Sequence, residues 1–248
     1  MQDIAIIGGT GLTSFPGLKI TLREVVRTPF GIPSGPITHG DYCGKKIIFL
    51  PRHGAHHTIP PHMVNYRANI WALHDMQVKQ IVAVAAVGSI NREIYPTQIV
   101  IPDQIIDYTY GRSQTFYEKD LSQVKHIDFT EPYDKKLRQN LIQAAALASI
   151  DVFDGGVYAT TQGPRLETAA EVNKLANDGC DIVGMTGMPE VSLAREFDLC
   201  YACCAVVANW AAGKSDQLIS MGEIEKNLKV GMKHVRKLLT KLLTIHRQ

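Results

Sequence analysis

Ile4-Ala5-Ile6-Ile7-Gly8-Gly9-Thr10-Gly11 begins as an apolar run and ends as a glycine-rich turn. This order is typical of a buried parallel strand whose following loop presents backbone N–H groups to an anion. The glycines allow the backbone to approach an oxyanion closely, and Thr10 adds a hydroxyl donor. Further along, Phe49-Leu50-Pro51 leads in the same way into Arg52-His53-Gly54. Two strand ends with anion donors predict a phosphate between them, although the glycines alone fit a structural turn equally well.

The glycine turn departs from two common nucleotide-binding motifs. The dinucleotide fingerprint needs a third glycine and an acid about 20 residues further on. Here the third glycine is missing and the first acid, Glu24, comes earlier. The Gly-Lys-Ser/Thr ending of an ATP-binding loop is absent as well. The motif therefore favours an anion site over a site for either cofactor.

Composition predicts one domain that spans residues 1–248. The chain has 248 residues, of which 45% are hydrophobic, and this is enough for one sizeable core. Its net charge of +2 does not call for nucleic acid as a partner. Basic residues near the C-terminus fall on an expected helix, where a solvated face explains them best. No apolar stretch approaches the roughly 18 residues that span a membrane, so no membrane partner is expected.

Cysteine usage and the N-terminus predict a cytoplasmic protein. Three of the five cysteines lie in the apolar segment 199–207, where a free thiol behaves as a small hydrophobe. No basic region precedes the first apolar run, as it would in a signal peptide. We expect all five thiols to be reduced.

Apolar runs alternate with helical patterns along the whole chain. The expected strands are residues 3–8, 45–51, 79–86, 98–102, 152–161, 181–185 and 200–208. The expected helices are residues 63–76, 134–148, 167–177, 189–197 and 222–245. This alternation predicts a single α/β domain with a mixed, largely parallel central sheet flanked by helices. Residues 108–130 fit neither pattern and are expected to be irregular.

Polar residues that follow the expected strands are the candidate site residues, because ligands of such sheets gather at the carboxyl ends of the strands. They are Gly8 to Gly11, Arg52, His53, Gly88, Ser89, Thr161 to Glu167, Met185, Thr186 and Asn209. The histidines at 53, 56, 57 and 62 are interrupted by two prolines and fit no standard metal-ligand spacing. No metal is therefore expected.

A series of short motifs runs in order along the chain. They are Ile6-Ile7-Gly8-Gly9-Thr10-Gly11, Thr28-Pro29-Phe30-Gly31, Arg52-His53-Gly54, His57-Thr58-Ile59, residues 65–73, Gly163-Pro164-Arg165, Met185-Thr186 and Met188-Pro189-Glu190. Together they resemble the trimeric purine nucleoside phosphorylase family, and most of all its methylthioadenosine phosphorylase branch. The resemblance covers nearly the whole chain. It implies a purine nucleoside substrate, inorganic phosphate as co-substrate with no cofactor, and a homotrimer or a dimer of trimers.

By position, the resemblance implies that Thr10, Arg52, His53 and Thr186 bind phosphate. Arg52 can offer a fork to two phosphate oxygens, which a lysine cannot match. Many relatives place a hydroxyl residue where this chain has Ala85-Ala86, so backbone N–H groups are the donors expected there.

Two departures from the adenine-specific relatives predict a 6-oxopurine base. Where those relatives have Asp-x-Asp, this chain reads Asn209-Trp210-Ala211, and an amide can donate to N7 and O6 whereas a carboxylate accepts. Where they have serine, Glu167 can accept from the N1 proton of a 6-oxopurine and opposes the N1 lone pair of adenine. Glu167 as a helix-start carboxylate and Asn209 as a strand cap are the structural alternatives.

The sugar end resembles the methylthio enzymes. Typical 6-oxopurine phosphorylases bring a histidine to the 5′-hydroxyl where this chain has residues 219–224. Met221 and Ile224 predict an apolar 5′ pocket there, unless they are simply core residues of a helix start. Met185 is expected beneath the sugar and Leu166 among the substrate-binding residues. His126 matches a family residue that reaches this end from the neighbouring subunit.

This mixture of sites predicts phosphorolysis of S-methyl-5′-thioinosine to hypoxanthine and S-methyl-5-thioribose 1-phosphate. Asn209, Glu167 and His53 are the expected catalytic residues, the last by holding the phosphate nucleophile. An inosine or guanosine phosphorylase and a methylthioadenosine phosphorylase are the enzyme alternatives. A purine nucleoside sensor without catalysis is the alternative from another class.

Overall fold

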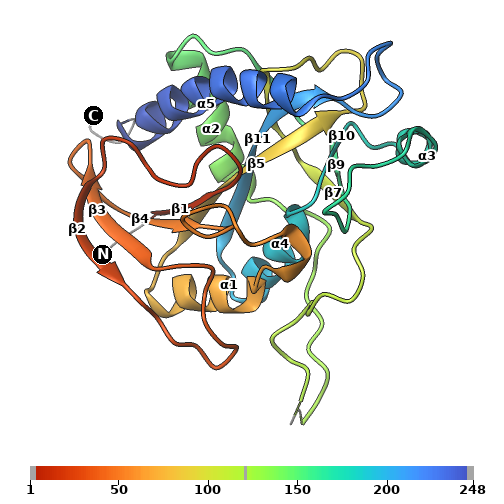
Figure 1. The fold of residues 1–248 in the computed structure, drawn as a ribbon. Helices are drawn as coiled ribbons and strands as arrows, with labels where there is room; N and C mark the ends of the chain where they lie inside the picture. The colour runs from red at the N-terminus through yellow and green to blue at the C-terminus, as the bar shows by residue number, and fades with distance from the viewer. Residues whose placement is uncertain (1–3, 120–121, 245–248) are drawn as a thin grey trace.

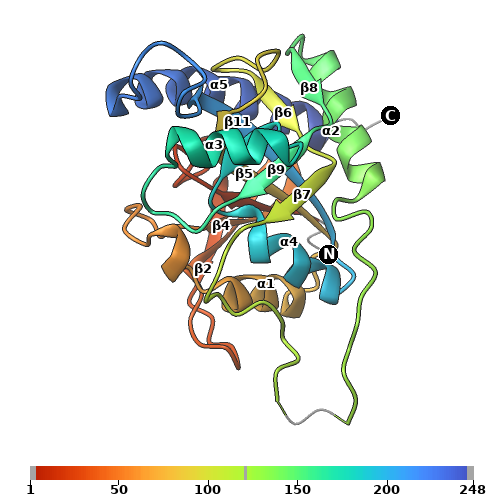
Figure 2. The same ribbon diagram turned by 90° about the vertical axis from the view of Figure 1, so that its right-hand side faces the viewer.

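The structure is a computed structural model that describes residues 4–119 and 122–244. A sheet of eleven strands forms its centre in the described part. Figure 1 shows α2 and α5 along one face of this sheet and α1 and α4 against the other, and Figure 2 shows α3 near β9. This confirms a single α/β fold with a mixed sheet between helices.

The sheet follows the order β2 (Lys19–Glu24), β3 (Ile37–Tyr42), β4 (Lys45–Pro51), β1 (Ile4–Gly8), β5 (Gln80–Ser89), β10 (Ile182–Gly184), β9 (Val157–Thr160) and β7 (Gln104–Asp107). Off this path, β11 (Cys200–Trp210) pairs with β5 and with β6 (Ile99–Ile101), and β6 pairs with β8 (Val152–Asp154). The neighbours of β5 show why the sheet is mixed: β1 and β11 run parallel to it, and β10 runs antiparallel.

The helices are α1 (Tyr66–Asp75), α2 (Lys135–Leu147), α3 (Ala169–Asn177), α4 (Gly187–Glu196) and α5 (Met221–Thr244), with a short 3-10 turn at Pro61–Met63. Polar side chains begin three of them: Asn65 caps α1, Asp134 caps α2 and Thr168 caps α3. Each accepts a hydrogen bond from a backbone N–H of the first turn, which has no partner inside the helix.

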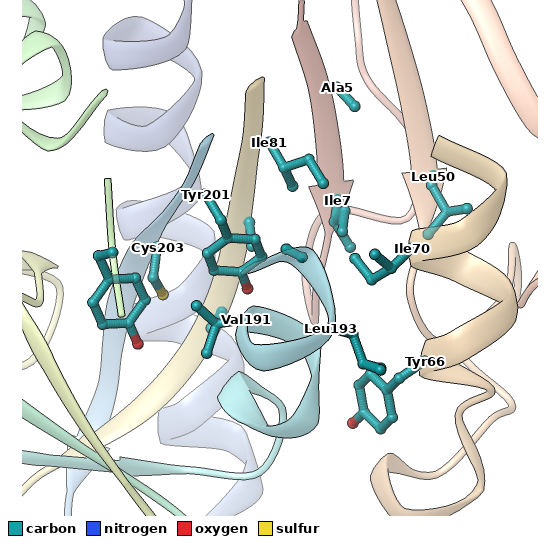
Figure 3. Close-up of a cluster of buried hydrophobic side chains, with 14 of the residues drawn as sticks. Ala5, Ile7, Leu50, Tyr66, Ile70, Ile81, Val191, Leu193, Tyr201 and Cys203 are labelled. Carbon is teal, nitrogen blue, oxygen red and sulfur yellow. The ribbon is translucent and has the colours of Figure 1, made fainter. Parts of the chain in front are cut away.

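Each face of the sheet carries its own apolar core. Figure 3 shows the cluster on the α1 and α4 side, where Ile7 and Ile81 from the sheet meet Ile70 and Leu193 from the helices. The opposite cluster joins the sheet to α2 and α5. The basic side chains at 226, 229, 233, 237 and 241 of α5 are exposed, as expected for a solvated face. Among the described residues, no helix has the length and apolar character needed to cross a bilayer.

Several strands differ from the sequence expectation. Residues 152–161 form two strands rather than one, because Gly155 and Gly156 both adopt positive φ, 99° and 97°, and turn the chain between β8 and β9. Strands β2, β3 and β7 were not expected. β2 is exposed along its whole length and β3 contains His39-Gly40-Asp41, so neither shows an apolar run.

The irregular stretch is confirmed. From 108 to 130 the described residues form no helix or strand. Figures 1 and 2 show this segment as a long loop that extends below α1 and α4 before it returns to α2. We call residues 108–130 the protruding loop.

Candidate active site

A cavity of about 590 Å³ lies beside the ends of β1, β4, β10 and β11. This volume falls in the range of small-molecule sites, roughly 300–1,000 Å³. All but one of the residues expected from the sequence to have a catalytic, substrate-binding or phosphate-binding role line it. They are Thr10, Arg52, His53, Ala85, Ala86, Leu166, Glu167, Met185, Thr186, Asn209, Met221 and Ile224.

The two strand ends that predicted an anion site lie next to each other. β1 and β4 are parallel, Gly8 lies opposite Pro51, and the Arg52 N–H donates to the Gly8 carbonyl at 2.9 Å. A Cβ on Gly9 would come within 2.4 Å of the Val84 carbonyl oxygen and 2.9 Å of Arg52 Nη1. Only glycine therefore permits the loop to cross the guanidinium this closely.

A gap in the sheet opens one edge of β5 toward the cavity. β5 pairs with β1 up to Ala83 and with β10 from Gly88 onward. Between these points the Val84 carbonyl accepts a hydrogen bond from Arg52 Nη1 at 2.8 Å. Because backbone groups on a strand alternate sides, the N–H of Ala86 faces the same gap, and that of Ala85 faces β11. Ala86 thus offers the backbone donor of this pair.

Arg52 is fully buried and its main fork is occupied by protein. Nε and Nη2 donate to the two carboxylate oxygens of Glu190 at 2.6 and 2.7 Å, and the Tyr201 hydroxyl donates to Glu190 Oε1 at 2.7 Å. Burial by itself lowers the pKa of Arg52, but the Glu190 carboxylate outweighs it, so the net pKa is raised. This corrects the expectation that the fork binds phosphate. One N–H on each of Nη1 and Nη2 is left for a ligand.

His53 is neutral and its tautomer is set by the backbone. Nδ1 lies 2.8 Å from the Ile59 carbonyl oxygen, which can only accept, so Nδ1 carries the proton. Burial and the Arg52 cation lower the pKa of His53 to about 4. Nε2 therefore has a free lone pair, and it suits an acceptor role toward a protonated phosphate oxygen.

Glu167 lies before α3 rather than in its first turn. Thr168 is the N-cap, and its side chain and that of Glu171 form a reciprocal capping box. The start of α3 is thus capped without Glu167. The alternative that Glu167 is simply a helix-start carboxylate is therefore ruled out. Its Oε1 accepts a hydrogen bond from the Thr161 hydroxyl at 2.6 Å instead.

Asn209 lies where β11 loses its regular pairing with β5. The register shifts between Val207 and Asn209, and such bulges often redirect side chains beside active sites. Asn209 Nδ2 donates to the Trp210 carbonyl at 2.7 Å. The second amide proton and the side-chain oxygen remain to meet a ligand.

The part of the cavity beside Met185 and α5 is apolar and open. Met185 follows β10, and a Cβ on Gly163 would lie 2.4 Å from its sulfur, so glycine lets the loop that carries Glu167 cross Met185. Leu166 and Met221 line the mouth although they are 43% and 65% exposed. His126 is the exception among the expected residues, because it is exposed on the protruding loop and does not line this cavity.

A sequence profile described as the Phosphorylase superfamily matches residues 3–244. The chain belongs to this superfamily. The phosphorylase is 53% identical over 244 residues to a probable S-methyl-5′-thioinosine phosphorylase of Pseudomonas syringae pv. tomato, covering 98% of this chain and 99% of that protein. It is 44% identical over 244 residues to the 6-oxopurine nucleoside phosphorylase of Pyrococcus furiosus, covering 96% and 91%.

A solved structure confirms the fold of this phosphorylase. Methylthioadenosine phosphorylase from Schistosoma mansoni, in complex with adenine, matches it with a TM-score of 0.94 at 35% identity. The match covers 99% of this chain and 92% of the other.

Sequence reasoning missed three residues around the phosphorylase cavity. Glu190 stands in a quoted motif, but its pairing with Arg52 joins residues 138 positions apart. Thr161 was included in a candidate segment without a role. Arg112 lies in the protruding loop, where no periodic pattern marks it.

Arg112 ties the protruding loop to both sides of the cavity. Its Nη1 donates to the Met185 and Met188 carbonyls at 2.9 and 2.6 Å. Its Nη2 donates to the Thr161 and Gln162 carbonyls at 3.2 and 2.8 Å. One guanidinium thus fixes the segment that carries Met185 relative to the segment that leads to Glu167.

Proposed function

We propose that this phosphorylase cleaves S-methyl-5′-thioinosine with inorganic phosphate, giving hypoxanthine and S-methyl-5-thioribose 1-phosphate. The proposal rests on the position and the hydrogen bonding of Glu167. Its carboxylate lines the cavity, it is not used to begin α3, and one oxygen is already held by a hydroxyl. A fixed acceptor suits the N1 proton of a 6-oxopurine and opposes the N1 lone pair of adenine.

Asn209 supports the same base. Its remaining amide proton can donate to N7 as negative charge builds on the departing purine. Donors positioned where charge develops are worth about 10²–10³ in turnover. The 53% identity to a probable S-methyl-5′-thioinosine phosphorylase agrees with this choice of base and sugar.

The 5′ end supports a methylthio group rather than a hydroxyl. Met221, Ile224 and Leu228 of α5 line this part of the cavity, and no histidine from residues 219–224 is present to bond a hydroxyl. An apolar wall gains free energy by removing a methylthio group from water, and these three side chains offer a 5′-hydroxyl no hydrogen bond.

Phosphate is proposed to bind where β1, β4 and β5 meet. Thr10, Thr186 and the Ala86 N–H supply donors, Arg52 supplies its remaining N–H groups, and His53 Nε2 accepts from the phosphate hydroxyl. Attack on C1′ forms the new C–O bond while the C1′–N9 bond breaks, and the bonding electrons leave with the purine. The purine anion takes up one proton to become hypoxanthine, and the sugar phosphate gives up its hydroxyl proton, so the reaction balances. The phosphate dianion balances the positive charge that develops on the sugar.

The protein is proposed to act in the cytoplasm as a homotrimer, or as a dimer of trimers. Cys180, Cys200, Cys203 and Cys204 are free thiols, which suits a reducing compartment. The open mouth of the cavity and the distant position of His126 support a site completed by a neighbouring subunit.

The test is phosphate-dependent base release from methylthioinosine, methylthioadenosine and inosine, each well below saturation. We expect the highest kcat/KM with methylthioinosine. Dominance of methylthioadenosine would contradict the base assignment, and dominance of inosine would contradict the 5′ pocket. The 44% identity to a 6-oxopurine nucleoside phosphorylase makes the inosine enzyme the second candidate. Binding without phosphate-dependent release would indicate a sensor.

A further inference from the structure

We infer that Thr161 determines base specificity by holding the Glu167 carboxylate in position for a 6-oxopurine. The inference rests on the proposed function, because it assigns Glu167 to the base. Thr161 itself does not line the main cavity. It is therefore a positioning residue that acts through Glu167.

The hydroxyl of Thr161 is held by the backbone around it. The Thr161 N–H donates to the Gly184 carbonyl at 2.8 Å, and the Thr161 carbonyl accepts from Arg112 Nη2 at 3.2 Å. The residue follows β9 directly and carries a branched side chain with few rotamers. The hydroxyl thus offers a fixed point to which the longer Glu167 side chain is attached.

The single hydroxyl proton of Thr161 has one good acceptor. Glu167 Oε1 lies 2.6 Å away, whereas the Gly184 carbonyl lies 3.3 Å away and already accepts the Thr161 N–H. A distance of about 2.6 Å is typical of a hydroxyl bonded to a charged carboxylate. Oε1 is therefore occupied by Thr161, and Oε2 remains for the base.

Glu167 needs this restraint because it lies between two cavities. Besides the main cavity, it lines a second cavity of about 210 Å³ whose other walls include Arg165 and Lys174. Arg165 already interacts electrostatically with Glu167, although its Nη atoms bond Glu171 at 2.8 and 2.7 Å. Without the Thr161 hydroxyl, the carboxylate is free to turn toward these cations and away from the base.

The test compares Thr161→Val with Thr161→Ser, using kcat/KM for methylthioinosine and methylthioadenosine. Valine keeps the branched shape and every backbone hydrogen bond but removes the hydroxyl. We expect Thr161→Val to lower kcat/KM for methylthioinosine about tenfold, the scale of one hydrogen bond to a charged group. We expect no fall with methylthioadenosine, because its N1 has no proton for Glu167. Thr161→Ser should retain the wild-type ratio.

Thr160→Val is the matched control. Thr160 is the preceding residue, its hydroxyl is buried without a hydrogen-bond partner, and the chemical change is the same. We expect Thr160→Val to leave kcat/KM unchanged for methylthioinosine and for methylthioadenosine. Thr161→Ala provides a second variant without the hydroxyl should the valine variant not fold, and its expected result is the same. The ratio of the dissociation constants of hypoxanthine and adenine, measured in the presence of phosphate, provides a second measure of the preference between the two bases.

An unchanged substrate ratio in the folded Thr161→Val or Thr161→Ala protein would overturn the inference. An equal fall with both substrates would also overturn it, since that indicates a merely structural role, as would a loss in Thr161→Ser as large as in Thr161→Val. Failure of the wild-type protein to cleave methylthioinosine would instead contradict the proposed function.

Discussion

Two adjacent residues, Arg52 and His53, respond differently to burial beside the cavity. Arg52 carries its charge in the interior, where Glu190 provides a bidentate partner. Removing either partner of such a pair leaves an unpaired buried charge, which is strongly destabilising. The burial of Arg52 therefore depends on its pairing with Glu190. Among the described residues His53 has no carboxylate partner, and burial together with the Arg52 cation keeps it neutral near pH 7.

The lowered pKa of His53 predicts how stability depends on pH. Its pKa is about 4 in the folded protein and about 6.5 in the unfolded chain, so the unfolded chain binds more protons between these values. Stability is therefore full above pH 6.5 and is lost as the pH falls toward 4. From pH 7 to pH 5, His53 should cost about 2 kcal/mol.

His53→Asn tests this dependence, because asparagine cannot titrate and its amide can replace the Nδ1 hydrogen bond. We expect the difference in unfolding free energy between pH 7 and pH 5, measured with urea, to shrink by about 2 kcal/mol. His56→Asn, on an exposed side chain of the same turn, is the matched control. An unchanged difference in His53→Asn would show that His53 does not titrate in this window.

At the scale of elements, the cavity walls are loops that follow separate strands, and Arg112 connects them. Its guanidinium donors reach carbonyls on the segments after β9 and after β10. A rigid five-donor fork can meet several acceptors at once, whereas the three donors of lysine sit on a single atom. The connection sets how far the segment that leads to Glu167 lies from the segment that carries Met185.

Arg112→Lys should therefore lower kcat/KM for methylthioinosine and methylthioadenosine by the same factor. A misplacement of about 1 Å can cost up to about 10²-fold in rate, and we expect a loss of that order. Arg67→Lys is the matched control, because Arg67 also contacts the protruding loop, at Glu118, but not the cavity. A change confined to one nucleoside, or none, would contradict this role for Arg112.

At the scale of the whole molecule, the protruding loop is the segment that extends away from the rest of the fold (Figure 1). It extends below α1 and α4 and carries exposed apolar side chains at Tyr110 and Val124. His126 lies on the same loop. These positions suit contact with a second copy, and the prediction from the sequence is that His126 reaches that copy's sugar site.

We expect the protein to sediment at three times the 27.4 kDa chain mass, or at six times for a dimer of trimers. His126→Ala should raise KM for methylthioinosine and leave KM for phosphate unchanged, because the resemblance assigns His126 to the 5′ end of the nucleoside and not to the phosphate. Mixing His126→Ala with Asn209→Ala subunits should restore activity, because some sites then combine an intact Asn209 with an intact His126 from the neighbour. A monomer, or no recovery on mixing, would contradict this arrangement.

The sequence by itself determined the layered α/β fold, because buried parallel strands need near-continuous apolar runs and such runs are visible in one dimension. It also located residues that line the cavity, among them Arg52, Glu167 and Asn209, since residues that follow parallel strands must meet at one edge of the sheet. β2 is exposed and has no apolar run, so the sequence did not predict it. The two glycines between β8 and β9 were not recognised as a turn, so one strand was expected where the structure has two.

Only the tertiary structure decided which donors remain for a ligand. Arg52 is bonded to Glu190, Thr161 is bonded to Glu167, and Arg112 is bonded to carbonyls of two loops. Each partner is set by distances between elements that are remote or irregular in the sequence. Hydrogen bonds form between atoms within about 3 Å, and no pattern of residue types along a chain specifies that proximity.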